Sequence, residues 1–125
     1  MTLIIPGRLP GLNEYTKANR TNPHTGAKMK REAEELIGWE IIAARLPKPI
    51  PFRVRIRFAW FEKDRRRDPD NIASAKKYIL DALVRAKVLQ GDGWRHIGGF
   101  EDRFAVDARR PRVEVEFFEE TGGVA

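Results

Sequence analysis

The sequence predicts an α+β domain with a single mixed β-sheet of about four strands and two α-helices packed on it, in the order βαβαββ. Two segments alternate apolar and polar side chains, as β-strands do, and two others repeat apolar side chains at three- and four-residue steps, as helices do. The 125 residues contain no internal repeat and match the usual size of one hydrophobic core. We therefore expect residues 1–120 to form a single domain and residues 121–125 a flexible tail.

The first half of the chain is expected to form a strand, a long loop and a helix. Residues 3–5 are a short apolar run that ends at Pro6. Repeated glycine, proline and asparagine residues then predict a long basic loop over residues 7–22. Over residues 30–45, apolar side chains recur at helical spacing with a single interrupting glycine. This pattern predicts an amphipathic helix that ends before Pro47.

The second half is expected to form a strand, a helix and two further strands. Alternation of apolar and mostly basic side chains over residues 52–60 predicts the clearest strand in the chain. Asp68 and the proline that follows it are typical of a helix start, and apolar residues at helical spacing then predict a helix over residues 69–87. The remaining apolar alternation predicts strands over residues 97–106 and 113–117.

Composition narrows the classes of function. The chain has no cysteine, which excludes disulfides, thiolate zinc sites, iron–sulfur clusters and thiol nucleophiles. Its N-terminal apolar run is shorter than a signal-peptide core of about 7–15 residues, so we expect a cytoplasmic protein without membrane association. A formal charge of +6 favours a polyanionic partner such as nucleic acid. Motifs of nucleotide-binding loops, zinc peptidases and serine hydrolases are absent from the sequence.

Three aspartates around the second predicted helix are the candidate catalytic and metal-binding residues. Asp68 and Asp70 lie at its start, and Asp92 lies on a turn beyond its end. Each also has a purely structural interpretation, as a helix cap, a first-turn charge and a turn residue. Carboxylates beside a run of arginines in a basic chain nevertheless favour a metal-dependent nuclease. Mg²⁺ or Mn²⁺ bound by their oxygens would offset their repulsion of a phosphate.

The length of the predicted helix limits how these aspartates can meet. A straight helix over residues 69–87 would be about 28 Å long, which separates Asp92 from Asp68 and Asp70. The three carboxylates can meet only if the helix is shorter or if the chain doubles back after it.

Several stretches share the order and spacing of one known family. They are residues 4–7 (IIPG), 12–15 (LNEY), 65–71 (RRRDPDN), 80–83 (LDAL) and 88–92 (VLQGD). On these stretches the chain resembles the RusA family of Holliday-junction resolvases, and the likeness covers most of its length. The resemblance implies a homodimeric, Mg²⁺-dependent endonuclease that resolves four-way DNA junctions with three aspartates and a lysine. The aspartates correspond to Asp68, Asp70 and Asp92.

The lysine departs from the family's pattern. Four residues after the second aspartate, where the family has lysine, this chain has Ser74. In the family the lysine also lies four residues before the aspartate of the LDAL stretch, and counting back four residues from Asp81 reaches Lys77. On a helix Lys77 lies about two turns after Asp70 and so on the same face. We therefore expect Lys77, rather than Lys76, to be the catalytic lysine. A solvated helix lysine is the alternative interpretation.

Basic and polar side chains outside the strands are the candidate DNA contacts. They are expected to bind phosphates, so that recognition depends on the shape of the DNA. The residues assigned this role are Arg65, Arg66, Arg67, Arg20, Lys28, Lys30 and Asn13. The three consecutive arginines have no expected acidic partner other than the site itself. The arginines of the strand over residues 52–60 are expected to pair with Glu114 and Glu116. Trp94 is expected to lie in the core or at an interface, and stacking on a DNA base is the alternative.

The sequence therefore predicts a Mg²⁺-dependent, structure-selective DNA endonuclease that resolves Holliday junctions by paired nicks in DNA recombination and repair. Lys77 would stabilise charge on the attacked phosphate or orient water. Leu36, Ile37, Trp39 or the aromatic residues of the strand over residues 52–60 would form the contact of the homodimer. A noncatalytic basic nucleic-acid-binding module, in which the aspartates are caps and turns, is the alternative.

Overall fold

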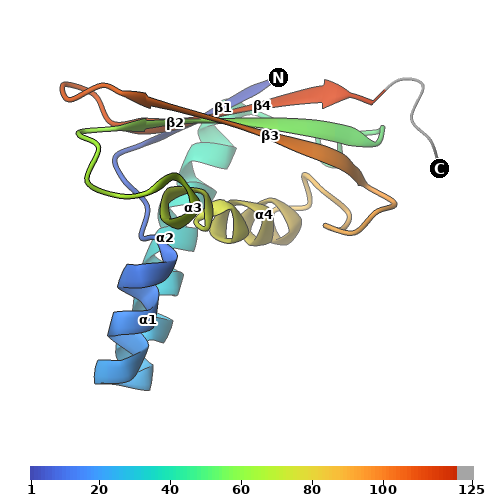
Figure 1. Ribbon diagram of the computed structural model, residues 1–125. Helices are drawn as coiled ribbons and strands as arrows, with labels where there is room; N and C mark the ends of the chain where they lie inside the picture. Colours follow the sequence, from blue (N-terminus) through green and yellow to red (C-terminus); the bar gives the residue numbers. More distant parts are fainter. Residues whose placement is uncertain (121–125) are drawn as a thin grey trace.

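The computed structural model describes residues 1–120, and its helices all lie on one face of a four-stranded sheet (Figure 1). The elements are β1 (Thr2–Pro6), α1 (Leu12–Thr21), α2 (Pro23–Ala44), β2 (Val54–Glu62), α3 (Pro69–Ala73), α4 (Lys76–Arg85), β3 (Ile97–Val106) and β4 (Arg112–Glu119). The strand order is β1-β4-β2-β3, with β4 antiparallel to both neighbours and β2 parallel to β3. The predicted fold class, α+β with one mixed four-stranded sheet, is confirmed. The tail predicted at residues 121–125 lies outside the described residues.

The core lies between the sheet and helices α2 and α4. On β2, every second side chain from Val54 to Glu62 is buried, as the alternation in the sequence predicts. Ile37 of α2 and Ile79 and Leu83 of α4 belong to the same buried cluster. This packing holds α3 and α4 against the sheet (Figure 1). Across residues 1–120, every helix is too short or too polar to span a bilayer.

The prediction of a long loop over residues 7–22 is wrong over most of that range, because residues 12–21 form helix α1. The N-cap residue of α1, Gly11, has no side chain that could accept hydrogen bonds from the first amides. Two residues of a distant segment do so instead. Ser74 Oγ accepts from the Leu12 amide at 2.7 Å, and Asn71 Oδ1 accepts from the Asn13 amide at 2.9 Å. A cap supplied from another segment leaves no local signal in the sequence.

Helix α2 begins at Pro23, rather than near residue 30 as predicted. Asn22 is its N-cap, and the Asn22 side chain accepts a hydrogen bond from the His24 amide at 2.8 Å. Helices α1 and α2 contact each other and extend together away from the sheet (Figure 1). We call residues 12–32 of this pair the helical arm.

The helix predicted for residues 69–87 is two helices, α3 and α4, and ends at Arg85. The break falls at Ser74, whose Oγ donates a hydrogen bond to the Asn71 carbonyl at 2.6 Å. The observed order is therefore βααβααββ rather than βαβαββ. Asp68 has the extended backbone of an N-cap, but its side chain makes no capping hydrogen bond.

Candidate functional site

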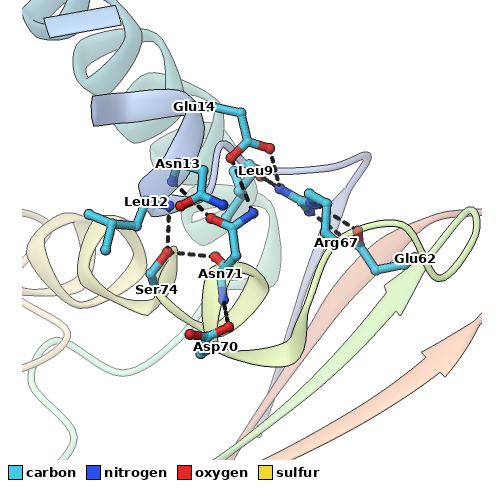
Figure 2. Close-up of polar contacts among 9 residues, drawn as sticks. All are labelled: Leu9, Leu12, Asn13, Glu14, Glu62, Arg67, Asp70, Asn71 and Ser74. Carbon is cyan, nitrogen blue, oxygen red and sulfur yellow. Dashed lines mark hydrogen bonds and ion pairs between the residues drawn. The ribbon is translucent and has the colours of Figure 1, made fainter. Parts of the chain in front are cut away.

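A largely buried group of charged and amide side chains, with Glu14 at its exposed rim, lies where the loop after β2, the start of α1 and the start of α3 meet (Figure 2). We call Glu14, Glu62, Arg67 and Asn71 the Arg67 cluster. Arg67 Nε and Nη2 donate to the two carboxylate oxygens of Glu62 at 2.9 and 2.8 Å. Its Nη1 donates to the Leu9 carbonyl at 2.9 Å and to Glu14 at 3.2 Å. Because the Arg67 side chain is only 10% exposed, this is a buried, bidentate ion pair.

Asn71 ties the Arg67 cluster to the start of α1. Its Nδ2 donates to Glu14 at 3.3 Å, while its Oδ1 accepts from the α1 amide of Asn13. The close approach also requires a glycine at position 11. A Cβ on Gly11 would lie 2.5 Å from Asn71 Oδ1 and 2.6 Å from the Asn71 carbonyl oxygen. The segment that starts α1 and the segment that carries Asp70 are therefore one structural unit (Figure 2).

Burial and charge act in opposite directions on the pKa values of the cluster. Burial lowers the pKa of Arg67, but the hydrogen bonds and charges of Glu62 and Glu14 outweigh it and leave the pKa above its ordinary value. Burial raises the pKa of Glu14, but hydrogen bonds from its own backbone amide, Arg67 and Asn71 leave the pKa below its ordinary value. The expectation that Arg67 has no local acidic partner is wrong. With its donors committed to the cluster, Arg67 is not a free phosphate contact.

Asp68 and Asp70 lie at the surface beside the Arg67 cluster. Both residues are exposed, and Asp70 Oδ1 accepts a hydrogen bond from the Asn71 amide at 2.9 Å. Asp68 lines a hollow between the loop after β2 and the C-terminal end of β3, together with Arg65 and Phe104. The buried ion pair therefore anchors a segment whose two aspartates face solvent.

A second, exposed group of charges lies on the first turns of α4 and the turn after it. We call Lys77, Asp81 and Asp92 the Lys77 cluster. Lys77 Nζ lies 2.9 Å from Asp81 Oδ1 and 3.3 Å from Asp92 Oδ2, and its side chain is 65% exposed. Hydrogen bonds to Asp81 and Asp92 raise the pKa of Lys77. The chain thus doubles back after α4 far enough for Asp92 to reach Lys77.

The neighbouring lysine points elsewhere. Lys76 Nζ lies 2.7 Å from Asp102 Oδ2 on β3 and 4.6 Å from the centre of the Phe100 ring. The two lysines have different partners, but the prediction that Lys77 lies on the same helix face as Asp70 is wrong in its premise, because Asp70 lies in α3 and Lys77 in α4. Lys76 is bound within the fold, whereas Lys77 lies at the surface beside Asp92.

The three predicted aspartates are not gathered in one place. Within residues 1–120, no group of three or more His, Cys, Asp and Glu side chains could hold a metal ion. Asp68 lines the hollow at one end of β3, whereas Asp92 lines a second hollow at its other end, beside Phe100. Lys77 also neutralises Asp92. The residues of one chain therefore do not fit a Mg²⁺ or Mn²⁺ ion as they are arranged. The assignment of Asp68, Asp70 and Asp92 as metal ligands stays a prediction.

The remaining candidate DNA contacts lie in two places. Arg65 and Arg66 are exposed on the loop before Asp68. Arg66 Nε is 3.6 Å from Asp64, so the expectation of no local acidic partner is wrong for Arg66 also. The others lie on the helical arm, and they are Asn13, Arg20, Lys28 and Lys30. Of these, Lys28 pairs with Glu32 at 3.7 Å and Lys30 with Asp81 at 3.8 Å. Lys30 and Lys77 line one hollow, so the arm adjoins the Lys77 cluster.

The arginines of β2 pair across the sheet, as expected, but their partners differ in part from those predicted. Arg57 lies 3.8 Å from Glu116 on β4 and 3.2 Å from Glu101 on β3. Glu114 pairs instead with Arg112 of its own strand at 2.6 Å. Glu101 was not anticipated, because the sequence does not reveal that β3 lies beside β2.

The exposure of each side chain shows which of the candidate residues could contact a partner subunit. Trp94 is 89% exposed, so the expectation that it lies in the core is wrong and an interface position stays a prediction. Ile37 and the core-facing aromatic residues of β2 are buried and cannot contact a partner, whereas Leu36 and Trp39 are exposed.

Sequence reasoning missed the acidic partners of Arg67. Glu62 continues the alternation of β2 onto the buried face, and a carboxylate at such a position requires a buried cation. That signal was present in the sequence. Glu14 and Asn71 carried no comparable signal, because their contacts join segments far apart in the chain.

Comparisons with known proteins do not assign a family. No protein-family model matches the chain, and no curated protein matches it. The resemblance to the RusA family is therefore carried by the sequence stretches alone and stays a prediction.

Proposed function

We propose that the chain is a structure-selective, Mg²⁺-dependent DNA endonuclease of the Holliday-junction resolvase type, acting as a homodimer in the cytoplasm, in DNA recombination and repair. The observation that carries this proposal is the exposed Lys77 cluster, in which Lys77 Nζ lies 3.3 Å from Asp92. Because Lys30 of the helical arm shares a hollow with Lys77, a phosphate backbone that follows the arm reaches this ammonium group.

The surroundings of each residue support a distinct role. Lys77 Nζ can donate a hydrogen bond to a phosphate oxygen and stabilise the charge that develops there during hydrolysis. Arg65 and Arg66, exposed beside Asp68, can bind phosphates at the end of β3 remote from Asp92. The Arg67 cluster positions the segment that carries Asp68 and Asp70. These two aspartates and Asp92 remain the proposed metal ligands, although one chain does not bring them together.

A synthetic four-way junction tests the proposal. Wild-type protein should nick it in the presence of Mg²⁺ and not in its absence. Asp70→Asn should abolish nicking and keep or improve binding, since a negative charge near phosphate is removed. The asparagine keeps an oxygen that can accept from the Asn71 amide, so the fold should be retained. Glu35→Gln, which removes an exposed carboxylate on α2, is the matched control and should leave nicking unchanged.

A noncatalytic basic nucleic-acid-binding module is the second candidate. It is favoured by the lack, among residues 1–120, of three carboxylates placed to share a metal ion. Both candidates predict affinity that falls steeply with added salt, because both bind phosphates. Only the second predicts junction binding without nicking under any divalent ion, and that result would contradict the endonuclease.

A further inference from the structure

The two edges of the sheet differ in how well they are protected. Strand β1 has five residues and ends at Pro6, which cannot donate to a further strand. Strand β3 has ten residues, and no strand of residues 1–120 pairs with its outer edge (Figure 1). It also exposes Phe100, Phe104 and Val106. A long edge with exposed apolar side chains is open to pairing with another strand.

The backbone of β3 shows which residues face that open edge. The Asp107 amide donates to the Glu62 carbonyl at 2.8 Å, toward β2. In a strand the N–H and C=O of one residue point to the same side, and those of the next residue point to the other side. Because Asp107 points toward β2, the even-numbered residues Phe100, Asp102 and Phe104 direct their N–H and C=O groups to the open edge. These three residues can therefore exchange hydrogen bonds with a further strand.

We propose that β3 pairs antiparallel with β3 of a second copy, about a two-fold axis that passes Asp102. Residues 100–104 read Phe-Glu-Asp-Arg-Phe, which is self-complementary about its centre. Phe100 then lies opposite Phe104 of the partner subunit, and Glu101 opposite Arg103 of the partner subunit. Within one chain Glu101 already lies 2.7 Å from Arg103 Nε and 3.2 Å from Arg57 Nε, so Arg103 of the partner subunit would join an existing ion-pair network. Symmetry repeats each pair. The Glu–Arg pairs fall at positions without mutual hydrogen bonds, where Cα atoms are about 4.5 Å apart and side chains are closest.

Neighbouring registers lack this complementarity. An axis at Arg103 would set two arginines opposite each other, and an axis at Glu101 two glutamates, which destabilises a pair. At the proposed axis, Asp102 faces its own copy. Each Asp102 carboxylate already accepts from Trp60 Nε1 at 2.8 Å and from Lys76 Nζ at 2.7 Å, so its charge is balanced within its own chain.

The pairing has a consequence that rests on the proposed function. The hollow with Asp92 includes residues 98–100 of β3, and the hollow with Asp68 includes residues 104–106. In the proposed register these two stretches lie side by side in different chains, about 4.8 Å apart. The hollow of Asp68 in one chain then adjoins the hollow of Asp92 in the other. Each nuclease site is thereby completed by the partner copy, which accounts for the separation of the aspartates within one chain.

Charge reversal tests the pairing independently of any activity. Wild-type protein should sediment at twice the mass of one chain. Glu101→Arg alone sets arginine opposite Arg103, and Arg103→Glu alone sets glutamate opposite Glu101, so each variant should sediment as a monomer. An equimolar mixture of the two variants restores both opposite-charge pairs and should sediment as a dimer. Glu35→Arg, a charge reversal on α2, should stay dimeric. A monomeric wild type, dimeric single variants or a mixture that stays monomeric would each overturn the pairing.

The same two variants force heterodimers and locate the nuclease site. Asp70→Asn in the Glu101→Arg chain, mixed with Asp92→Asn in the Arg103→Glu chain, should leave one complete site and nick a junction. Both aspartate changes in one chain, mixed with the other chain bearing only its charge reversal, should leave none. The reverse result would place each site within one chain and overturn the shared site. A lack of nicking in every mixture would overturn the nuclease and the shared site together, while sedimentation alone decides the β3 pairing.

Discussion

The Arg67 cluster includes Asn71 of α3, the Lys77 cluster lies on α4 and the turn after it, and each joins one basic side chain to two carboxylates. They differ in burial: the Arg67 side chain is 10% exposed and the Lys77 side chain 65%. A buried ion pair that loses one partner leaves an uncompensated charge, whereas an exposed pair contributes little to stability. The first cluster therefore belongs to the fold, and the second lies at the surface, where a ligand can reach Lys77.

Loss of the Arg67 guanidinium should have the largest effect on stability. Arg67→Met should lower the free energy of unfolding by about 3–5 kcal/mol, because Glu62 is left buried without its cation. Arg66→Met, one residue earlier, removes an exposed guanidinium and should cost less than about 0.5 kcal/mol. Urea denaturation of both variants measures the difference. Equal losses in the two variants would contradict the separation of buried from exposed charge.

Disturbing the contact between α1 and α3 should have the second-largest effect on stability. Gly11→Ala should cost about 1–3 kcal/mol, because the new Cβ collides with the Asn71 carbonyl and side chain, and neither can move freely. Gly38→Ala in α2 meets no atom within 4 Å and should instead stabilise by up to about 1 kcal/mol. Thermal and urea unfolding should therefore show opposite signs for the two substitutions. A neutral Gly11→Ala would contradict the close approach.

The pH dependence of stability should show the contribution of the Glu14 carboxylate. Its pKa is lowered in the folded chain, so its contribution is present above the pKa of the unfolded chain and is lost as the pH falls through the folded pKa. Unfolding free energy should therefore decline below about pH 4.5. In Glu14→Gln that decline should be shallower. Denaturation at a series of pH values from 6 down to about 3 measures both slopes, and parallel curves would contradict the role of Glu14 in the cluster.

The smallest effect on stability is expected at Lys77. Lys77→Ala should change the free energy of unfolding by less than about 0.5 kcal/mol, because Lys77 and Asp92 are exposed and Asp81 keeps a second cation, Lys30, at 3.8 Å. Lys76→Ala is the matched control and should cost about 1–3 kcal/mol, since it leaves the half-buried Asp102 without its cation. Urea denaturation separates the two. A loss at Lys77 as large as that at Lys76 would assign Lys77 to the fold.

The parts of the molecule that follow local rules could be predicted from the sequence. The alternation of β2 and β4 and the apolar spacing of α2 and α4 gave the fold class, because each pattern is contained in one segment. Helix α1 could not be predicted, since its cap comes from Asn71 and Ser74 across the fold. For the candidate site, the choice of Lys77 over Lys76 assumed one helix from Asp70 onward, and the break at Ser74 had no signal that was recognised in the sequence. The partners of Arg67 were missed because two of the three hydrogen-bonding groups, Leu9 and Glu14, are remote in sequence.

Cleavage of a four-way junction by Lys77→Ala, measured beside its unfolding free energy, tests the central claim most directly. The claim is that the exposed Lys77 cluster acts on DNA rather than on the fold. We expect nicking in Mg²⁺ to fall at least about 100-fold while stability and junction binding stay near the wild-type values. Unchanged nicking by a stably folded Lys77→Ala would contradict it.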